Sequence, residues 1–162
     1  MDLSLFITKA GMEKLQKRIN ELLSERPEVI KAVAIAREHG DLSENAEYKA
    51  ARERQRGIDS ELDHLRRRAP QLKVVDPSQI PDHAKLGVYF GSYCVAQDLS
   101  DGKAETYQVV GAEELNFTFE EGVQAVSIVS PIGKALYQKK PGEIAIVEAP
   151  RGRRQLKIIE IK

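Results

Sequence analysis

The sequence predicts an α+β protein: an N-terminal antiparallel coiled-coil hairpin, followed by a small β-sheet domain with one short helix. Two observations predict this class. Residues 12–72 carry two long series of seam residues at helical spacing, and residues 83–162 carry short β-rich runs separated by turn signals. The helical pattern gives way to the β-rich pattern at a segment that contains Asp76, Pro77 and Pro81. We therefore divide the chain into a hairpin at 1–75, a linker at 76–82 and a sheet domain at 83–162.

The hairpin is predicted from the spacing of its seam residues. In each series the residues follow one another at alternating intervals of three and four, which keeps one stripe facing a partner helix. Residues equally distant from position 42 pair off, as Ala36 does with Tyr48, so the chain should reverse near Gly40. We expect helices over about 8–38 and 43–72. The seam residues are Met12, Leu15, Ile19, Leu22, Arg26, Val29, Val33 and Ala36, then Tyr48, Ala51, Gln55, Ile58, Leu62, Leu65, Ala69 and Leu72.

One stretch of the seam is weak. Arg26 and Gln55 are polar, and Pro27 lacks a backbone N–H, so we expect a kink near 23–27. The kink either directs the tip of the hairpin or is a tolerated defect. Arms of about 30 residues at ~1.5 Å per residue make a rod of roughly 45 Å, too long and thin for a globular domain. A rod of this kind usually spans a distance between two sites, clamps a partner or reaches into one.

The second half reads as a small sheet of about five strands. The helix within it is "SPIGKALYQKK", with Ser130 as N-cap and Pro131 at the first helical position. We find no nucleotide-binding glycine pattern, no paired metal-ligand cysteines and no nucleophile motif in these residues. The predicted strands lie in "GVYFGSYCVAQ", "TYQVVG", "QAVSIVS", "EIAIVEA" and "QLKIIEIK".

Composition bounds the function only loosely. The 162 residues are 41% hydrophobic, enough for a packed core, and Lys+Arg equals Asp+Glu at 25 each, so net charge argues neither for nor against nucleic acid. The single cysteine, Cys94, fits a reducing cytosol and is expected in the core. We see no signal peptide and nothing near the ~20 apolar residues of a membrane span, and so expect a cytoplasmic protein.

The predicted turn carries two carboxylates with two possible roles. If Asp41 is the N-cap of the second helix, Glu44 falls at the third helical position and completes a capping box. Alternatively, both are hard oxygen ligands suited to Mg²⁺. Two are too few for an octahedral shell, so the tip would complete a metal site owned by another enzyme, where a second metal activates water for attack on a phosphodiester.

A basic stripe follows the turn. Lys49, Arg52 and Arg56 are spaced i, i+3 and i+7, which places them on one face of the second helix. They either bind a phosphate backbone or form a solvated face with ordinary ion pairs. Tyr48 either stacks on a base or packs in the seam.

The tip sequence resembles a known family. The run "AIAREHGDLSENAEYKAARERQ" at 34–55 is similar to the signature of the bacterial Gre transcript-cleavage factors, of the GreA/GreB type and closer to GreA. "SPIGKAL" at 130–136 resembles the family's "SPIARAL", and the resemblance covers nearly the whole chain.

The resemblance implies a fold and a function. The C-terminal domain would be similar to FK506-binding proteins and would dock, through Val129, Ser130 and Pro131, at the rim of the secondary channel of bacterial RNA polymerase. The hairpin would enter the channel, where Asp41 and Glu44 hold Mg²⁺ jointly with the polymerase.

This transcription elongation factor would stimulate hydrolytic cleavage of the 3′ end of backtracked nascent RNA and rescue arrested complexes. The same resemblance implies a cytoplasmic member of the DNA-binding transcription machinery that is not an enzyme by itself. We expect a monomer, no membrane association and no metal held tightly by the free protein. The residues expected to contact RNA are Tyr48, Lys49, Arg52 and Arg56.

Some features depart from the family pattern. Val129 stands where the family usually has Asn or Asp, and the arginines at 52, 54 and 56 leave the length of the cleaved fragments open. The fold resemblance implies no prolyl isomerase activity. Two other functions compete: a channel-binding paralogue that modulates or inhibits polymerase without cleavage, and a structural arm, which gives no reason for acids at the apex.

Overall fold

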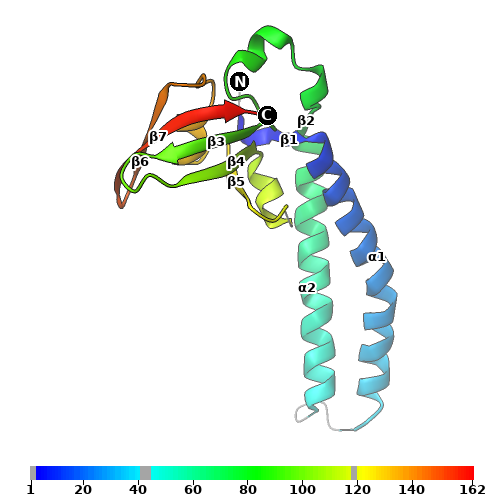
Figure 1. The fold of residues 1–162 in the computed structure, drawn as a ribbon. Coiled ribbons are helices and arrows are strands. Elements are labelled where there is room, and N and C mark those ends of the chain that lie inside the picture. Colours follow the sequence, from blue (N-terminus) through cyan, green and yellow to red (C-terminus); the bar gives the residue numbers. More distant parts are fainter. Residues whose placement is uncertain (1–2, 41–44, 118–119) are drawn as a thin grey trace. The chain divides into compact units, whose positions relative to one another are not determined.

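The computed structural model describes residues 3–40, 45–117 and 120–162 (Figure 1). Two long helices and a mixed β-sheet make it an α+β protein, so the predicted class is confirmed. The chain forms two compact units, Glu13–Gln71 and a second one of Met1–Met12 with Leu72–Lys162. The sequence-based division at 76–82 differs from this, because the segments on both sides of the hairpin join the sheet unit.

The hairpin consists of α1 (Lys9–Arg37) and α2 (Ala46–Arg68), followed by a 3₁₀ turn at Ala69–Gln71. The first helix agrees with the prediction within one residue at each end. It continues through Pro27, although a proline removes one intrahelical hydrogen bond. The second helix begins three residues later than predicted.

The predicted seam forms the core of the hairpin. None of its sixteen positions is exposed, and the apolar members are buried or half-buried. The polar position Arg26 is satisfied across the hairpin, where its Nε donates to Asp59 Oδ1 at 2.7 Å. The fully or almost fully buried seam residues are Leu15, Ile19, Leu22, Val29, Val33, Ala36, Ile58, Leu62, Leu65 and Leu72.

Ion pairs across the hairpin confirm that the helices are antiparallel. Near the start of α1, Arg18 donates from Nε and Nη2 to the two carboxylate oxygens of Glu61, near the end of α2, at 2.9 Å each. These hydrogen bonds lower the pKa of Glu61 and raise that of Arg18. At the other end Asn45, which precedes α2, contacts Ala36 in the last turn of α1.

The second unit is built on a five-stranded sheet with the order β5-β4-β3-β7-β6. All five strands predicted from sequence are present. Neighbours pair antiparallel except β4 and β5, which are parallel and are joined through a 3₁₀ turn at Ala112–Asn116. The strands are β3 (Tyr93–Asp98), β4 (Ala104–Val110), β5 (Val123–Ser127), β6 (Ile144–Ala149) and β7 (Gly152–Ile161).

One face of this sheet carries the core. Alternate residues of its strands are buried together with Leu136 of the short helix α3 (Pro131–Leu136). Cys94 is fully buried among them, and burial raises the pKa of its thiol to about 11, so it is a core residue as predicted. The core residues are Val88, Phe90, Cys94, Ala96, Tyr107, Val109, Val126, Ile128, Leu136, Ala145, Val147, Leu156 and Ile158.

A second, two-stranded sheet was not predicted. β1 (Phe6–Thr8) and β2 (Lys73–Val75) pair in parallel, with Phe6 opposite Lys73 and Thr8 opposite Val75. The ring of Phe6 also meets that of Phe90 edge to face, with the centroids 5.6 Å apart. The remaining short elements of the described chain are 3₁₀ turns at Leu3–Leu5, Pro77–Gln79 and Asp82–Leu86.

A buried carboxylate fastens β1 to the sheet unit. Glu114 is 2% exposed, and its Oε2 accepts from the backbone N–H groups of Thr8 at 3.0 Å and Gly111 at 2.7 Å. Its Oε1 accepts from the hydroxyl of Thr8, whose oxygen in turn accepts from the N–H of Gly11 at 3.0 Å and so caps α1. A Cβ at Gly111 would lie 2.0 Å from the carbonyl oxygen of Phe6, so only glycine fits there.

Candidate functional site

The tip of the hairpin is described on both sides of the predicted acidic segment. α1 ends at Arg37 and a turn continues to Gly40, which has a φ of 116°. The description resumes at Asn45. Asp41 and Glu44, the predicted metal ligands, lie outside the described residues.

The start of α2 differs from the capping-box hypothesis. The N-cap is Asn45, whose Oδ1 accepts from the backbone N–H of Tyr48 at 3.0 Å. Its Nδ2 also donates to the carbonyl oxygen of Ala36, 2.7 Å away in the last turn of α1. The expectation that Asp41 caps this helix is therefore wrong, because Asn45 is closer to the first helical residue and gains a second bond across the hairpin.

Tyr48 packs beside the turn and is half-buried. The guanidinium carbon of Arg37 lies 5.7 Å from the centroid of its ring, a cation–π contact between the two helices. The neighbouring Arg37 side chain, by its hydrogen bond, lowers the pKa of Tyr48, and the charges of Arg37, Arg52 and Arg56 act in the same direction. Arg37 therefore occupies one face of the ring, and the base-stacking hypothesis for Tyr48 applies to its other face.

The basic stripe forms as predicted from spacing. Lys49, Arg52 and Arg56, with Tyr48 and Glu53, line one hollow of about 340 Å³ on α2. Within the described part of the chain neither Lys49 nor Arg56 is in an ion pair. The hydrogen bond from Arg52 to Gln55 is long, at 3.4 Å. The hollow thus holds three cationic side chains and one acid, Glu53.

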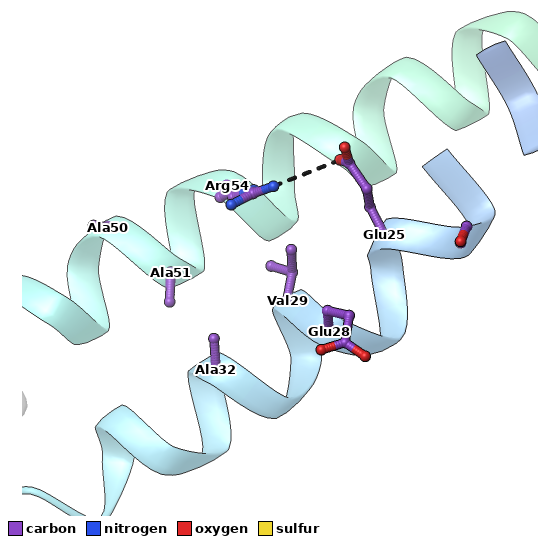
Figure 2. Close-up of a pocket in the computed structure, with 8 residues that line it drawn as sticks. Glu25, Glu28, Val29, Ala32, Ala50, Ala51 and Arg54 are labelled. Carbon is purple, nitrogen blue, oxygen red and sulfur yellow. Dashed lines mark ion pairs between the residues drawn. The ribbon is translucent and has the colours of Figure 1, made fainter. Parts of the chain in front are cut away.

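Arg54 belongs to another surface of the same helix. Its Nη2 lies 3.7 Å from Oε2 of Glu25 on α1, and Figure 2 shows this pair bridging the two helices. The pair lines a hollow of about 540 Å³, in which the short side chains of Ala32 and Ala51 point toward each other from the two helices (Figure 2). Of the arginines at 52, 54 and 56, Arg54 is therefore engaged within the hairpin and does not belong to the stripe.

The predicted docking residues lie at the start of α3. Ser130 is the N-cap, as predicted: its Oγ accepts from the N–H of Gly133 at 3.1 Å and donates to the carbonyl of Ser127 at 2.6 Å. Pro131 is the first helical residue and is exposed. Val129 is half-buried against the core, so this position contributes packing instead of a polar side chain.

The described residues contain no group of three or more His, Cys, Asp and Glu side chains that could hold a metal ion. None of the described helices is long and apolar enough to cross a membrane. Asp41 and Glu44 are too few to fill the octahedral shell of Mg²⁺. A metal bound through them would therefore need further ligands from another molecule or from water.

A two-helix hairpin with a basic stripe near its tip and a small mixed sheet define a two-unit α+β protein with a cationic surface on α2. Residues 5–74 match the family described as "Transcription elongation factor, N-terminal", and residues 84–162 match "Transcription elongation factor, GreA/GreB, C-term". The chain belongs to the GreA/GreB family of transcription elongation factors.

Curated relatives agree with this assignment. A "Transcription elongation factor GreA" of Alkalilimnicola ehrlichii is 40% identical over 96% of each chain, and one of Neisseria meningitidis serogroup A is 40% identical with the same coverage. Among solved structures, Thermus aquaticus Gfh1 is 23% identical over 97% of each chain, with a TM-score of 0.42. At that identity and TM-score the likeness adds nothing to the assignment.

Proposed function

We propose that this chain enters the secondary channel of bacterial RNA polymerase and stimulates hydrolytic cleavage of the 3′ end of backtracked nascent RNA. Membership of a family of transcription elongation factors supports an action on the elongating polymerase. The cleavage step itself is inferred from the tip residues. A factor of this kind works in the cytoplasm, and we propose that it does so as a monomer.

The observation that carries the proposal is the cap of α2. Because Asn45 caps the helix, an N-cap role does not account for the acids at 41 and 44. Two carboxylates at the end of a hairpin remain, and oxygen ligands of this type suit Mg²⁺. Asp41 and Glu44 would hold the ion jointly with the polymerase, and the bound ion would activate the attacking water.

The other residues of the tip bind and orient the RNA. Lys49, Arg52 and Arg56 line one hollow and would hold phosphates of the displaced 3′ segment, while Tyr48, by the ring face away from Arg37, would contact a base. The chain is then no enzyme by itself, since the active site and most metal ligands belong to the polymerase. The exposed Pro131, with Ser130 and Val129, would form the docking surface on the polymerase rim.

The test is a cleavage assay on polymerase stalled in a backtracked complex with Mg²⁺. We expect short 3′ RNA fragments with the native chain and far fewer with Asp41→Asn or Glu44→Gln, while binding to polymerase persists. Glu38→Gln, which removes one exposed charge near the same turn, is the matched control and should cleave normally.

Two results would refute the proposal in different ways. Equal cleavage by native and Asp41→Asn chains would remove the metal role. Binding of the native chain without any fragments would favour the paralogue that modulates polymerase without cleavage.

A further inference from the structure

We propose that the sheet unit binds a small organic anion with a flat apolar body. The site is a hollow of about 420 Å³, within the range of roughly 300–1,000 Å³ that ligand pockets occupy. It is lined by Phe6 of β1, by Val75 of β2, and by residues between 80 and 90 and between 137 and 140. All of these belong to the sheet unit, and the proposed docking residues 129–131 are not among them. The site is therefore separate from the surfaces that the proposed function uses.

Four rings line this site, which we call the aromatic hollow: those of Phe6, Tyr89, Phe90 and Tyr137. Two of them are fixed by packing, since Phe90 is almost fully buried and meets Phe6 edge to face. Leu86, which lines the same hollow, is 62% exposed. Covering an exposed leucine removes apolar surface from water, and aromatic rings favour flat partners that stack on them or meet them edge on. A flat apolar group therefore suits the aromatic hollow.

Three polar side chains of the lining have no partner. His83, Tyr137 and Lys140 make no side-chain hydrogen bond or ion pair among the described residues. The carboxylate of Glu143 accepts from the backbone N–H of Lys140 at 2.9 Å and leaves its ammonium group unpaired.

The charge around the aromatic hollow is positive. None of the described residues that line it is acidic, and a second ammonium, that of Lys85, lies 5.7 Å from the centroid of the Tyr89 ring. Unpaired donors and positive charge without an acid in the lining favour a negatively charged ligand group, which charge-assisted hydrogen bonds would hold. The polar side of the hollow thus complements an anion, as its rings complement a flat apolar body.

The wall formed by residues 137–140 is fixed by the protein itself. The N–H of Gln138 donates to the carbonyl of Val88 at 2.7 Å, and the N–H of Val88 donates to the carbonyl of Lys139 at 2.8 Å. A Cβ at Gly87 would lie 2.6 Å from the carbonyl oxygen of Gln138, so glycine permits this close approach.

The same wall contains a strained residue. Gln138 has a φ of 68°, a left-handed conformation that is uncommon for a residue other than glycine. Such conformations cost free energy, persist where surrounding contacts fix them, and are frequent at ligand sites. A wall that is already ordered adds little entropic cost to binding, so even a small ligand can gain affinity from it.

Two probes of the same shape and different charge test the proposal: naphthalene-1-acetate and its neutral amide, naphthalene-1-acetamide. In calorimetric titration of the full chain, we expect the acetate to bind with a dissociation constant of about 1 mM or below. The amide should bind about ten-fold more weakly, because it lacks the charge.

Lys140→Gln separates the role of the ammonium from that of the rings. We expect the affinity for the acetate to fall about three- to five-fold, as for an exposed ion pair, and the affinity for the amide to stay native. A variant that merely perturbed the fold would weaken both probes. Lys103→Gln is the matched control, since it removes an exposed ammonium between β3 and β4 that does not line the aromatic hollow. It should bind both probes as the native chain does.

Methyl NMR of the full chain shows where the acetate binds. The naphthalene ring should shift the methyl resonances of Ile80 and Leu86, which line the aromatic hollow. It should leave those of Ile144 and Ile146, which are exposed apolar residues on β6 outside the hollow.

Three results would overturn the proposal. Equal affinity of the native chain for acetate and amide would favour an apolar side chain of a partner protein as the occupant. Shifts of the same size at Ile144 and Ile146 would show unspecific apolar adsorption. Absence of heat and of shifts with the acetate up to about 10 mM would show that the aromatic hollow binds no such anion.

Discussion

Removing the carboxylate of Glu114 should detach the N-terminal strand from the sheet unit. This side chain is 2% exposed and accepts three hydrogen bonds, from the N–H and hydroxyl of Thr8 and the N–H of Gly111. Glu114→Ala leaves both backbone donors without an acceptor in a buried site. Each unsatisfied buried donor costs about 1–3 kcal/mol, so the expected loss is about 2–6 kcal/mol.

The geometry predicts a much smaller effect for Glu114→Gln. Both backbone N–H groups bind the same oxygen, Oε2, which the amide oxygen of glutamine can replace. The new NH₂ would face Thr8 Oγ1, a hydroxyl that can turn to accept. Glutamine therefore keeps all three contacts without the charge, and we expect a loss of about 1 kcal/mol.

Urea unfolding followed by tyrosine fluorescence measures both variants, because four of the five tyrosines, at 89, 93, 107 and 137, lie in the sheet unit. Glu121→Ala, which removes an exposed carboxylate from the same unit, is the control and should stay within about 0.5 kcal/mol of native. An alanine variant as stable as this control, or a glutamine variant as unstable as alanine, would refute the reasoning.

Three other outcomes are expected. Hydrogen bonds from Arg18 hold the pKa of Glu61 below its usual range, so their contribution is present above about pH 4.3 and is lost as the pH falls through the lowered value. In thermal unfolding, Glu61→Gln should cost less than ~1 kcal/mol at pH 7, and this cost should shrink as the pH falls below about 4.3. Ser130→Ala should destabilise the sheet unit by about 1 kcal/mol in urea, whereas Ser130→Asp keeps the cap. Arg56→Gln should reduce the cleavage rate and its salt dependence; Arg54→Gln, whose guanidinium is engaged with α1, should change neither.

The seam and the sheet were predictable because their signals are periodic. Alternation of three and four places Leu22 and Leu62 in one core, and alternation of two places Cys94 and Ala96 on one face of β3. Such patterns repeat over many residues, so single polar positions such as Arg26 do not obscure them.

The cap of α2 was not predictable from spacing. Asp41, Ser43 and Asn45 are all good capping residues within five positions, and Asp41 has an acid at the capping-box distance. The decision falls to Asn45, which gains a hydrogen bond to Ala36 on the other helix. Contacts of this kind depend on the pairing of the helices and leave no local sign. The positions of Asp41 and Glu44 stay a prediction.

No local sequence pattern indicates that the carboxylate of Glu114 is buried. "GAEELN" reads as a polar loop, and the partner that buries Glu114 is Thr8, 106 residues earlier. β1 and β2 are three residues each, which is too short for a periodic pattern. Because parallel strands are not joined by a hairpin turn, no turn sequence indicates their pairing either.

The parallel pairing of β1 with β2 has a consequence for how the hairpin could vary. β1 ends at Thr8 and β2 begins at Lys73, opposite Phe6, so the helical arms are an insertion between two neighbouring strands. Matched seven-residue deletions, one from each arm, would shorten the insertion by about 10 Å while preserving the seam phase and both strands. Reach is thus a quantity that evolution or an engineer can adjust without rebuilding the rest of the molecule.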